Sequence, residues 1–351
     1  MDTHIIQDTT ALTSTQGNRR VIYAATLLLV IVGSLLVYKG TAALAVMVKV
    51  QNTGALQPSV NVVPIPGNAA QVNVAVRSLN YFLVVWPALL FGILISGAVR
   101  VLVPPRWLGR VLGSGRVRPQ LLAGLAGAPL MLCSCCVAPV FSGLYERSSR
   151  LGPSLAVMLA APSLNPAALI LTFMLFDHRI AVTRLAVAGL AVFLTGMVMD
   201  KLFSLRPMDC PTTDEQSGNP VLTTFLRSCL QVTVRTVPLI AVGVLISMAV
   251  ALWLPAGSLA STGGQTVAIV VVALIAVPLA LPTFFEIPLA LILLSAGAPP
   301  GAAIAMMIAG PAVNLPSLFT IARSTNWKVA GSVALTIFVL SVAGGLLVSL
   351  V

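Results

Sequence analysis

The sequence predicts an all-α polytopic membrane protein that is built from two inverted repeats. Hydrophobic residues make up 58% of its 351 residues and charged residues only 8%, whereas roughly a quarter of the residues in a soluble domain are charged. Apolar runs long enough to cross about 30 Å of hydrocarbon recur along the chain. One pattern of prolines, glycines and an asparagine occurs twice. The net charge of +11 does not indicate nucleic-acid binding, because the arginines lie between the apolar runs rather than in one patch.

Seven apolar runs are long enough to be single membrane-spanning helices, and two longer tracts need separate treatment. The seven runs cover residues 21–38, 79–103, 151–176, 180–199, 228–254, 300–322 and 328–351. The two longer tracts cover residues 119–145 and 265–296.

The chain begins with a polar stretch followed by an apolar one. Residues 1–20 are rich in Thr and Gln and predict a cytoplasmic tail without regular structure. Arg19 and Arg20 precede an apolar run that ends at Lys39 without a clear cleavage site, so we interpret 21–50 as an uncleaved signal-anchor helix. The paired arginines would keep the N-terminus in the cytoplasm. Two polar segments rich in proline then predict an extracytoplasmic segment over 51–77 and a cytoplasmic linker over 205–222.

The repeated pattern divides the rest of the chain in two. At an offset of 149 residues, the prolines, glycines and asparagines of the first copy fall on those of the second. The pairs are Pro129 with Pro278, Pro139 with Pro288, Gly152 with Gly301, Pro162 with Pro311 and Asn165 with Asn314. We assign the first repeat to 78–204 and the second to 223–351.

The charges between the apolar runs predict that the repeats are inverted. Five arginines lie between Arg100 and Arg118, which places the loop 104–118 in the cytoplasm. The equivalent loop of the second repeat, 256–265, carries no charge, so we expect it on the opposite side. Inversion needs an odd number of crossings in each repeat. We therefore expect the tracts 119–145 and 265–296 to be re-entrant hairpins, an arrangement that leaves few basic residues outside: Lys39, Lys49, Arg179 and Arg184.

The first hairpin is expected to turn at a cluster of cysteines between two prolines. Proline removes a backbone donor and breaks a helix. The backbone groups that it frees are tolerated in a membrane only where protein or a water-filled cavity covers them. The pattern predicts a substrate site, and a proline-kinked helix with cysteines as small packing residues is the alternative. The candidate residues are Cys133, Ser134, Cys135 and Cys136.

Each repeat also contains a break midway along a run that must span the bilayer. The first break follows Pro162 and carries Ser163 and Asn165. The second follows Pro311 and carries Asn314. Broken helices direct half-helix ends toward the bilayer centre, where ions and polar ligands bind. We expect these amides to bind substrate, and the alternative is that they only satisfy local backbone groups.

The tip of the second hairpin contains the single acid that lies deep in an apolar tract. Thr283 and Glu286 lie between two prolines at 282–288. Burying a charge there costs about 2.5–3.5 kcal/mol, so Glu286 is protonated, paired or exposed to water. Arg235, which also lies inside an apolar run, is the expected partner. Two roles stay open for the pair, proton coupling and a purely structural ion pair.

The cysteines indicate a class of substrate and leave one alternative. Thiolates are soft ligands for copper(I) and, by the same chemistry, for trivalent arsenic or antimony. We expect no cofactor and no resident metal site. Cys133 and Cys136 also form a C-x-x-C pair, so a membrane thiol-disulfide oxidoreductase is the alternative function. Such an enzyme usually needs a second pair to pass on electrons, and Cys210 and Cys229 do not form one.

The motifs at the predicted breaks resemble those of the ArsP/YraQ-type predicted permeases. The similar segments are 133–139 (CSCCVAP), 161–166 (APSLNP) and 309–314 (AGPAVN), and the resemblance covers roughly 78–350. It implies an inner-membrane permease, with efflux of trivalent organoarsenicals in some members. This chain carries Cys136 where members commonly have glycine, and Phe284-Phe285-Glu286 where small polar residues or cysteine are expected.

From these observations we expect a permease and not an enzyme. Its substrate would be a small molecule such as a thiophilic metalloid or organoarsenical that binds at mid-membrane and moves by alternating access, with proton exchange at Glu286. The lipid bilayer is the other expected partner, nucleic acid is not expected, and a homo-oligomer is left open.

Overall fold

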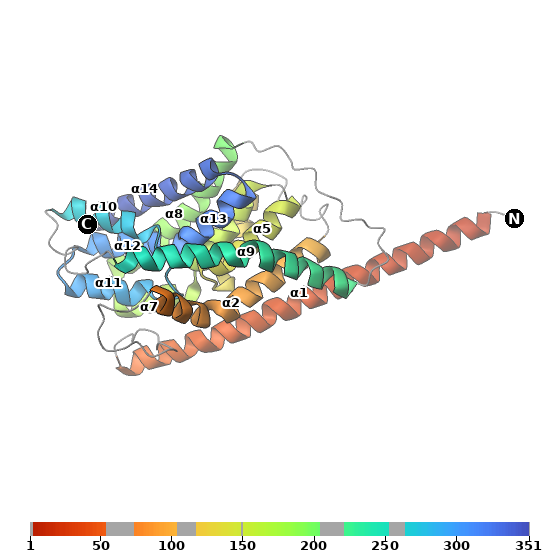
Figure 1. The fold of residues 1–351 in the computed structure, drawn as a ribbon, viewed down its shortest axis with the longest axis horizontal. Coiled ribbons are helices and arrows are strands. Elements are labelled where there is room, and N and C mark those ends of the chain that lie inside the picture. The colour runs from red at the N-terminus through yellow and green to blue at the C-terminus, as the bar shows by residue number, and fades with distance from the viewer. Residues whose placement is uncertain are drawn as a thin grey trace.

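The computed structural model describes residues 3–53, 74–103, 117–148, 150–203, 221–252 and 264–350. Every regular element within these residues is a helix, which confirms the predicted all-α class (Figure 1). Most of the predicted extracytoplasmic segment 51–77 lies outside the described residues. So do most of the arginine-rich loop 104–118, the linker with Cys210 and the uncharged loop 256–265.

The helices after the first follow one order twice. The first series is α2 (Val74–Leu102), α4 (Val117–Gly127), the short 3-10 helix η2 (Ala128–Leu130), α5 (Ser134–Ser148), α6 (Leu151–Ser163), α7 (Pro166–Leu175) and α8 (His178–Leu202). The second series is α9 (Val221–Leu252), α10 (Gln265–Ala276), α11 (Glu286–Ser295), α12 (Pro300–Ala312), α13 (Leu315–Ser324) and α14 (Trp327–Leu350). By position in the chain, α2 corresponds to α9, α5 to α11, α7 to α13 and α8 to α14. The inversion of one series relative to the other stays a prediction.

Length and composition make this a multi-pass membrane protein. Among the described residues, six helices are long and apolar enough to cross a membrane, and the bent pair α12–α13 is a seventh candidate. These seven coincide with the seven predicted runs. The helices α10 and α11 are too short to cross alone. They are separated by irregular backbone at 277–285, as a hairpin tip requires, although entry and return on one side stay a prediction.

The first helix differs from the sequence-based expectation. The helix α1 (Thr3–Thr53) is continuous through the stretch expected to lack regular structure, and no proline precedes Pro58 that would interrupt it. Apolar residues resume after Lys39, so the candidate span is Thr26–Thr53 and Lys39 lies inside it rather than beyond its end. The N-terminal end of α1 extends past the rest of the molecule, and its later part packs against α2 and α7 (Figure 1).

Pairs of glycines at the same repeat positions allow close helix crossings in both halves. Gly301 of α12 and Gly345 of α14 face each other, and a Cβ on Gly345 would lie 2.6 Å from the Gly301 carbonyl oxygen. Gly152 of α6 and Gly196 of α8 occupy the equivalent positions, where both face the side chain of Gln120. No larger residue fits at Gly345 without a shift of the backbone.

Candidate functional site

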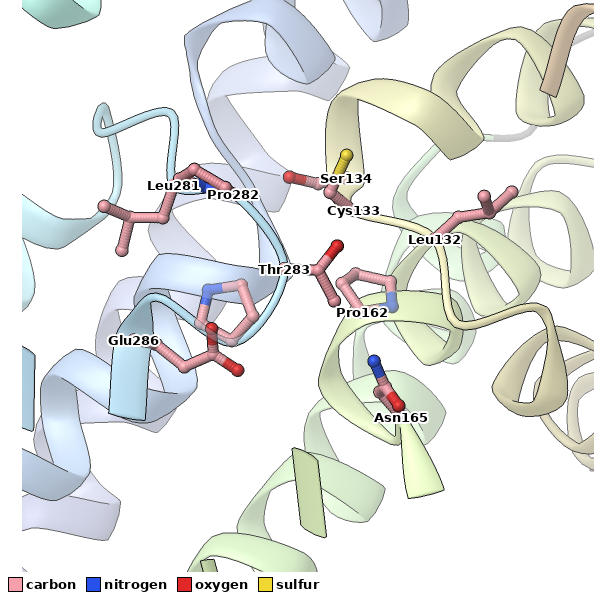
Figure 2. A pocket seen from close by; sticks show the side chains of 10 residues that line it. Leu132, Cys133, Ser134, Pro162, Asn165, Leu281, Pro282, Thr283 and Glu286 are labelled. Carbon is pink, nitrogen blue, oxygen red and sulfur yellow. The ribbon is translucent and has the colours of Figure 1, made fainter. Parts of the chain in front are cut away.

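The four predicted breaks in helical backbone meet at one small cavity. Its volume is about 10 Å³, roughly the room that one water molecule needs. Figure 2 shows side chains from all of these segments around it. The lining residues are Leu132, Cys133, Ser134, Pro162, Asn165, Leu281, Pro282, Thr283, Glu286 and Pro311. Segments far apart in the sequence thus form one site.

The first break lies slightly earlier than the sequence predicts. Met131 adopts a left-handed conformation with φ of 50°, and residues 131–133 are irregular. The helix α5 begins at Ser134, and the Cys133 carbonyl accepts hydrogen bonds from the amides of Cys136 and Val137, both at 3.0 Å. Ser134, Cys135 and Cys136 therefore form the first helical turn of α5 instead of the expected hairpin turn.

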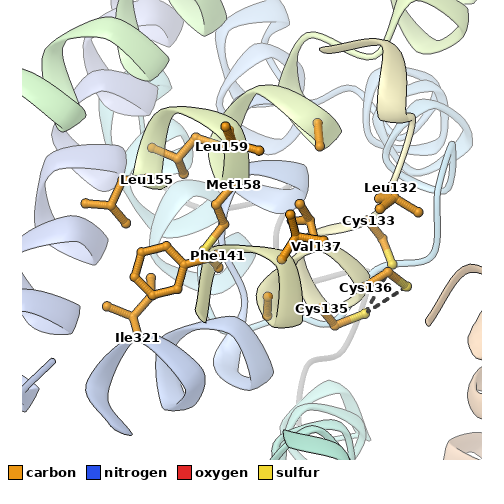
Figure 3. Close-up of a cluster of buried hydrophobic side chains, with 14 of the residues drawn as sticks. Leu132, Cys133, Cys135, Cys136, Val137, Phe141, Leu155, Met158, Leu159 and Ile321 are labelled. Carbon is orange, nitrogen blue, oxygen red and sulfur yellow. Dashed lines mark hydrogen bonds between the residues drawn. The ribbon is translucent and has the colours of Figure 1, made fainter. Parts of the chain in front are cut away.

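Three thiols gather beside the cavity, but only one of them lines it. The sulfur of Cys135 lies 3.1 Å from that of Cys133 and 3.8 Å from that of Cys136, and Figure 3 shows the three together in an apolar cluster. Cys133 is among the residues that line the cavity. Cys135 and Cys136 face α2 instead, where the Tyr81 hydroxyl lies 3.1 Å from the sulfur of Cys135 and the Val85 carbonyl accepts from Cys136 at 3.9 Å.

Asparagines cap the second half of each broken helix. The Oδ1 of Asn165 accepts from the amides of Ala167 at 3.0 Å and Ala168 at 3.4 Å. The Oδ1 of Asn314 accepts from the Ser317 amide at 3.0 Å, and the pair forms a capping box. The alternative interpretation is therefore correct for both oxygens. The amide nitrogens differ, because the buried Nδ2 atoms of both side chains have no hydrogen-bond partner among the described residues.

The acid of the second tip has a different partner from the predicted one. Arg184 of α8 donates from Nη2 to the Oε1 of Glu286 at 3.0 Å, and both side chains are buried. The second terminal nitrogen, Nη1, donates to Thr172 and lies 3.7 Å from the sulfur of Met307. Arg235, the predicted partner, is exposed on α9. Arg184 was also expected outside the membrane, and the structure places it in the core.

The buried arginine could have been found from the sequence. Arg184 lies inside the apolar run 180–199, and a charge in such a run indicates a functional or paired residue by the same rule that identified Glu286. Arg235 lies inside an apolar run in the same way. Only the tertiary packing shows that Arg184 faces the interior while Arg235 faces outward.

The structure brings together only some of the predicted site residues. Those at the cavity are Cys133, Ser134, Asn165, Thr283 and Glu286. Those that do not line it are Cys135, Cys136, Ser163, Asn314 and Arg235. Ser163 is buried, and its hydroxyl has no partner within the described part of the chain.

Known proteins are similar to this chain over most of its length. Residues 71–350 match the ArsP family profile, which is described as a predicted permease. The UPF0718 protein YraQ of Escherichia coli is 29% identical over 252 residues, which cover 70% of this chain and 72% of that protein. The UPF0718 protein MJ0584 of Methanocaldococcus jannaschii is 21% identical over 305 residues, covering 67% and 84% respectively. No solved structure matches. The helix α1 precedes the matched region.

Proposed function

Because the chain belongs to the ArsP-type predicted permease family, we propose that it is an inner-membrane permease that carries a small solute through the cavity at the four helix breaks. The family match and the membrane helices support a transporter rather than an enzyme. The observation that carries the proposal is the convergence of four breaks on one buried cavity. Irregular backbone at membrane depth is tolerated only where protein or a water-filled cavity covers it, and in transporters such breaks are where substrates bind.

The thiol at the cavity supports a thiophilic solute such as a trivalent metalloid or an organoarsenical. Cys133 supplies one thiol to the cavity, and the sulfurs of Cys133, Cys135 and Cys136 lie within 4.8 Å of one another. A solute bound at Cys133 therefore has two further soft ligands close by. All three thiols are buried. Their burial argues against the alternative, a thiol-disulfide oxidoreductase, because catalytic thiols need access to a partner protein or cofactor.

Unequal packing of equivalent helices supports alternating access. The helix α5 packs along α2, whereas its equivalent α11 has no comparable packing against α9 among the described residues. The helix α13 packs along α9, whereas its equivalent α7 has no comparable packing against α2. If the repeats are inverted, each can adopt the helix packing that the other has in this structure. This change would close the site to one side of the membrane and open it to the other. The N-terminus would face the cytoplasm.

Proton exchange at Glu286 is the proposed coupling step. Glu286 lines the cavity, and its partner Arg184 belongs to the other repeat. Protonation of the carboxylate would weaken the one ion pair that joins the repeats among the described residues. A proton would bind to Glu286 when the site is open to one side of the membrane and leave when it is open to the other. Proton movement would thereby be coupled to the conformational change.

Flux through proteoliposomes tests the proposal. Vesicles that contain the purified chain should move methylarsonous acid, a trivalent organoarsenical, faster than protein-free vesicles. Cys133→Ser should lower this flux by about tenfold or more, since a lost ligand interaction of about 1.4 kcal/mol is tenfold in affinity. Cys136→Ser is the matched control and should keep part of the flux, because Cys136 does not line the cavity. If the chain instead catalyses thiol-disulfide exchange without any flux, and Cys136→Ser abolishes that exchange, the protein is the oxidoreductase.

A further inference from the structure

The cavity wall carries a buried hydrogen-bond donor that the protein leaves unused. Asn165 is 1% exposed, and its Nδ2 has no partner among the described residues. Its oxygen is fixed by the α7 amides, so the side chain cannot flip without losing its cap. Figure 2 shows the amide nitrogen turned toward Pro162 and Thr283, which line the cavity. A buried amide without a partner costs about 1–3 kcal/mol, and a ligand that accepts a hydrogen bond removes this cost.

Helix ends of both signs meet at this wall, since α6 and α12 end beside it, at Ser163 and Ala312, while two other helices present their positive ends near Asn165. The helices α5 and α7 both begin at the cavity, at Ser134 and next to Asn165. Each N-terminus is equivalent to roughly half a positive charge. The helix α11 also begins there, but its own Glu286 already occupies that end. The charge of Glu286 is balanced by Arg184 at 3.0 Å, so the helix ends of α5 and α7 are not neutralised by it.

Three carbonyl groups at the breaks have partners within the protein. The Pro278 carbonyl accepts from the Ser247 hydroxyl at 2.8 Å and from the Leu315 amide at 3.4 Å. The Cys133 carbonyl accepts two amides, and the Pro282 carbonyl accepts the Phe285 amide at 3.1 Å. A cation site would need these oxygens free. These three oxygens are occupied, whereas the Nδ2 of Asn165 has no partner among the described residues.

From the unpaired Asn165 donor beside the N-termini of α5 and α7 we infer that the cavity binds a negatively charged group, so that it favours solutes that are small oxyanions or carboxylates or carry such a group. The inference rests on the proposed function and deepens it, because it names a second chemical feature of the substrate beside the thiophilic atom at Cys133. The anionic group lies at the α5 and α7 ends, where Asn165 Nδ2 donates to it. At about 10 Å³ the cavity must widen to admit such a solute.

Thermal unfolding of the purified full-length chain in detergent tests this inference with defined probes. Inorganic phosphate, sulfate and acetate are titrated separately as sodium salts. At least one of them should raise the unfolding temperature in a saturable way, because a ligand that binds only the folded state stabilises it. Asn165→Asp keeps the capping oxygen and removes the donor, and aspartate is as good a cap as asparagine. It should weaken the apparent affinity for that anion by at least about tenfold, which is 1.4 kcal/mol.

A matched variant separates a binding effect from a general one. Asn314→Asp makes the same chemical change at the equivalent cap, which does not line the cavity, so it should respond like the wild type. Asn165→Ser, which also keeps a capping oxygen, replaces Asn165→Asp if that variant does not fold. The inference is overturned if no anion gives a saturable rise, if the Asn165 variants respond like the wild type, or if Asn314→Asp loses the response equally. If no anion stabilises the protein but the vesicles still transport methylarsonous acid, only this inference is wrong. If an anion stabilises the protein but the vesicles transport nothing, the proposed function is wrong.

Discussion

At the scale of single residues, the ion pair between Arg184 and Glu286 is the most costly feature of the core. Both side chains are almost fully buried, and removing two charges from water costs several kcal/mol for each ion before their attraction repays it. The pair joins α8 of the first repeat to α11 of the second. Well-packed apolar residues at the two positions would stabilise that contact at least equally. A buried ion pair that includes Glu286 of the cavity wall is therefore better explained by transport than by stability.

This burial predicts how variants of the pair behave. Arg184→Met leaves the Glu286 carboxylate buried without its partner and should destabilise the protein by about 3–5 kcal/mol. The double variant Arg184→Met with Glu286→Gln should regain much of that loss, because no uncompensated charge remains. Chemical denaturation of the purified variants measures both effects. Arg235→Met is the control, since Arg235 is exposed on α9, and it should change stability by less than about 0.5 kcal/mol. Equal losses for Arg184→Met and Arg235→Met would show that Arg184 has no special role.

At the scale of helices, the glycine pair of α12 and α14 sets how closely the second repeat packs. A Cβ on Gly345 would lie 2.6 Å from the Gly301 carbonyl oxygen and 2.7 Å from Ile269. Gly345→Ala should therefore force the two helices apart and destabilise the protein by about 1–3 kcal/mol. Gly331→Ala on the same helix is the control, because nothing lies within 4 Å of its Cβ, and it should be neutral or stabilise by up to about 1 kcal/mol. Thermal unfolding of the two variants side by side measures the difference, and a stable Gly345→Ala variant would contradict the crossing.

The helix breaks also show what the sequence can and cannot predict. The breaks before Pro166 and Leu315 were predicted correctly, because a proline and a capping asparagine act within one turn of the chain. The first tip was misplaced by a few residues, since Ser134 starts a helix where a turn was expected. The partner of Glu286 was wrong for a different reason. It depends on which face of α8 or α9 meets α11, and that is a property of tertiary packing rather than of local sequence.

At the scale of the whole molecule, α1 lies outside the region that matches the family. The matched region begins at residue 71, after α1 has ended. Only 17% of the α1 span is buried, and large apolar side chains such as Leu29 and Val37 are exposed, as expected for a helix that faces lipid. Its buried contacts are few and include Leu35 against the main core and Val50 beside α7.

This peripheral position predicts that the permease core folds without α1. A chain that starts at residue 71 should insert into membranes, stay monodisperse in detergent and lose only a few degrees in unfolding temperature, because little of the α1 surface is buried against the core. Its flux of methylarsonous acid should stay within about threefold of the full chain, since no α1 residue lines the cavity and a threefold change corresponds to less than 1 kcal/mol. The full chain with Leu35→Ala, which weakens one α1 contact and keeps the helix, is the matched comparison. If the shortened chain aggregates or loses its flux entirely, α1 is an integral part of the transport unit, and the repeats alone are not sufficient to hold the four breaks around the cavity.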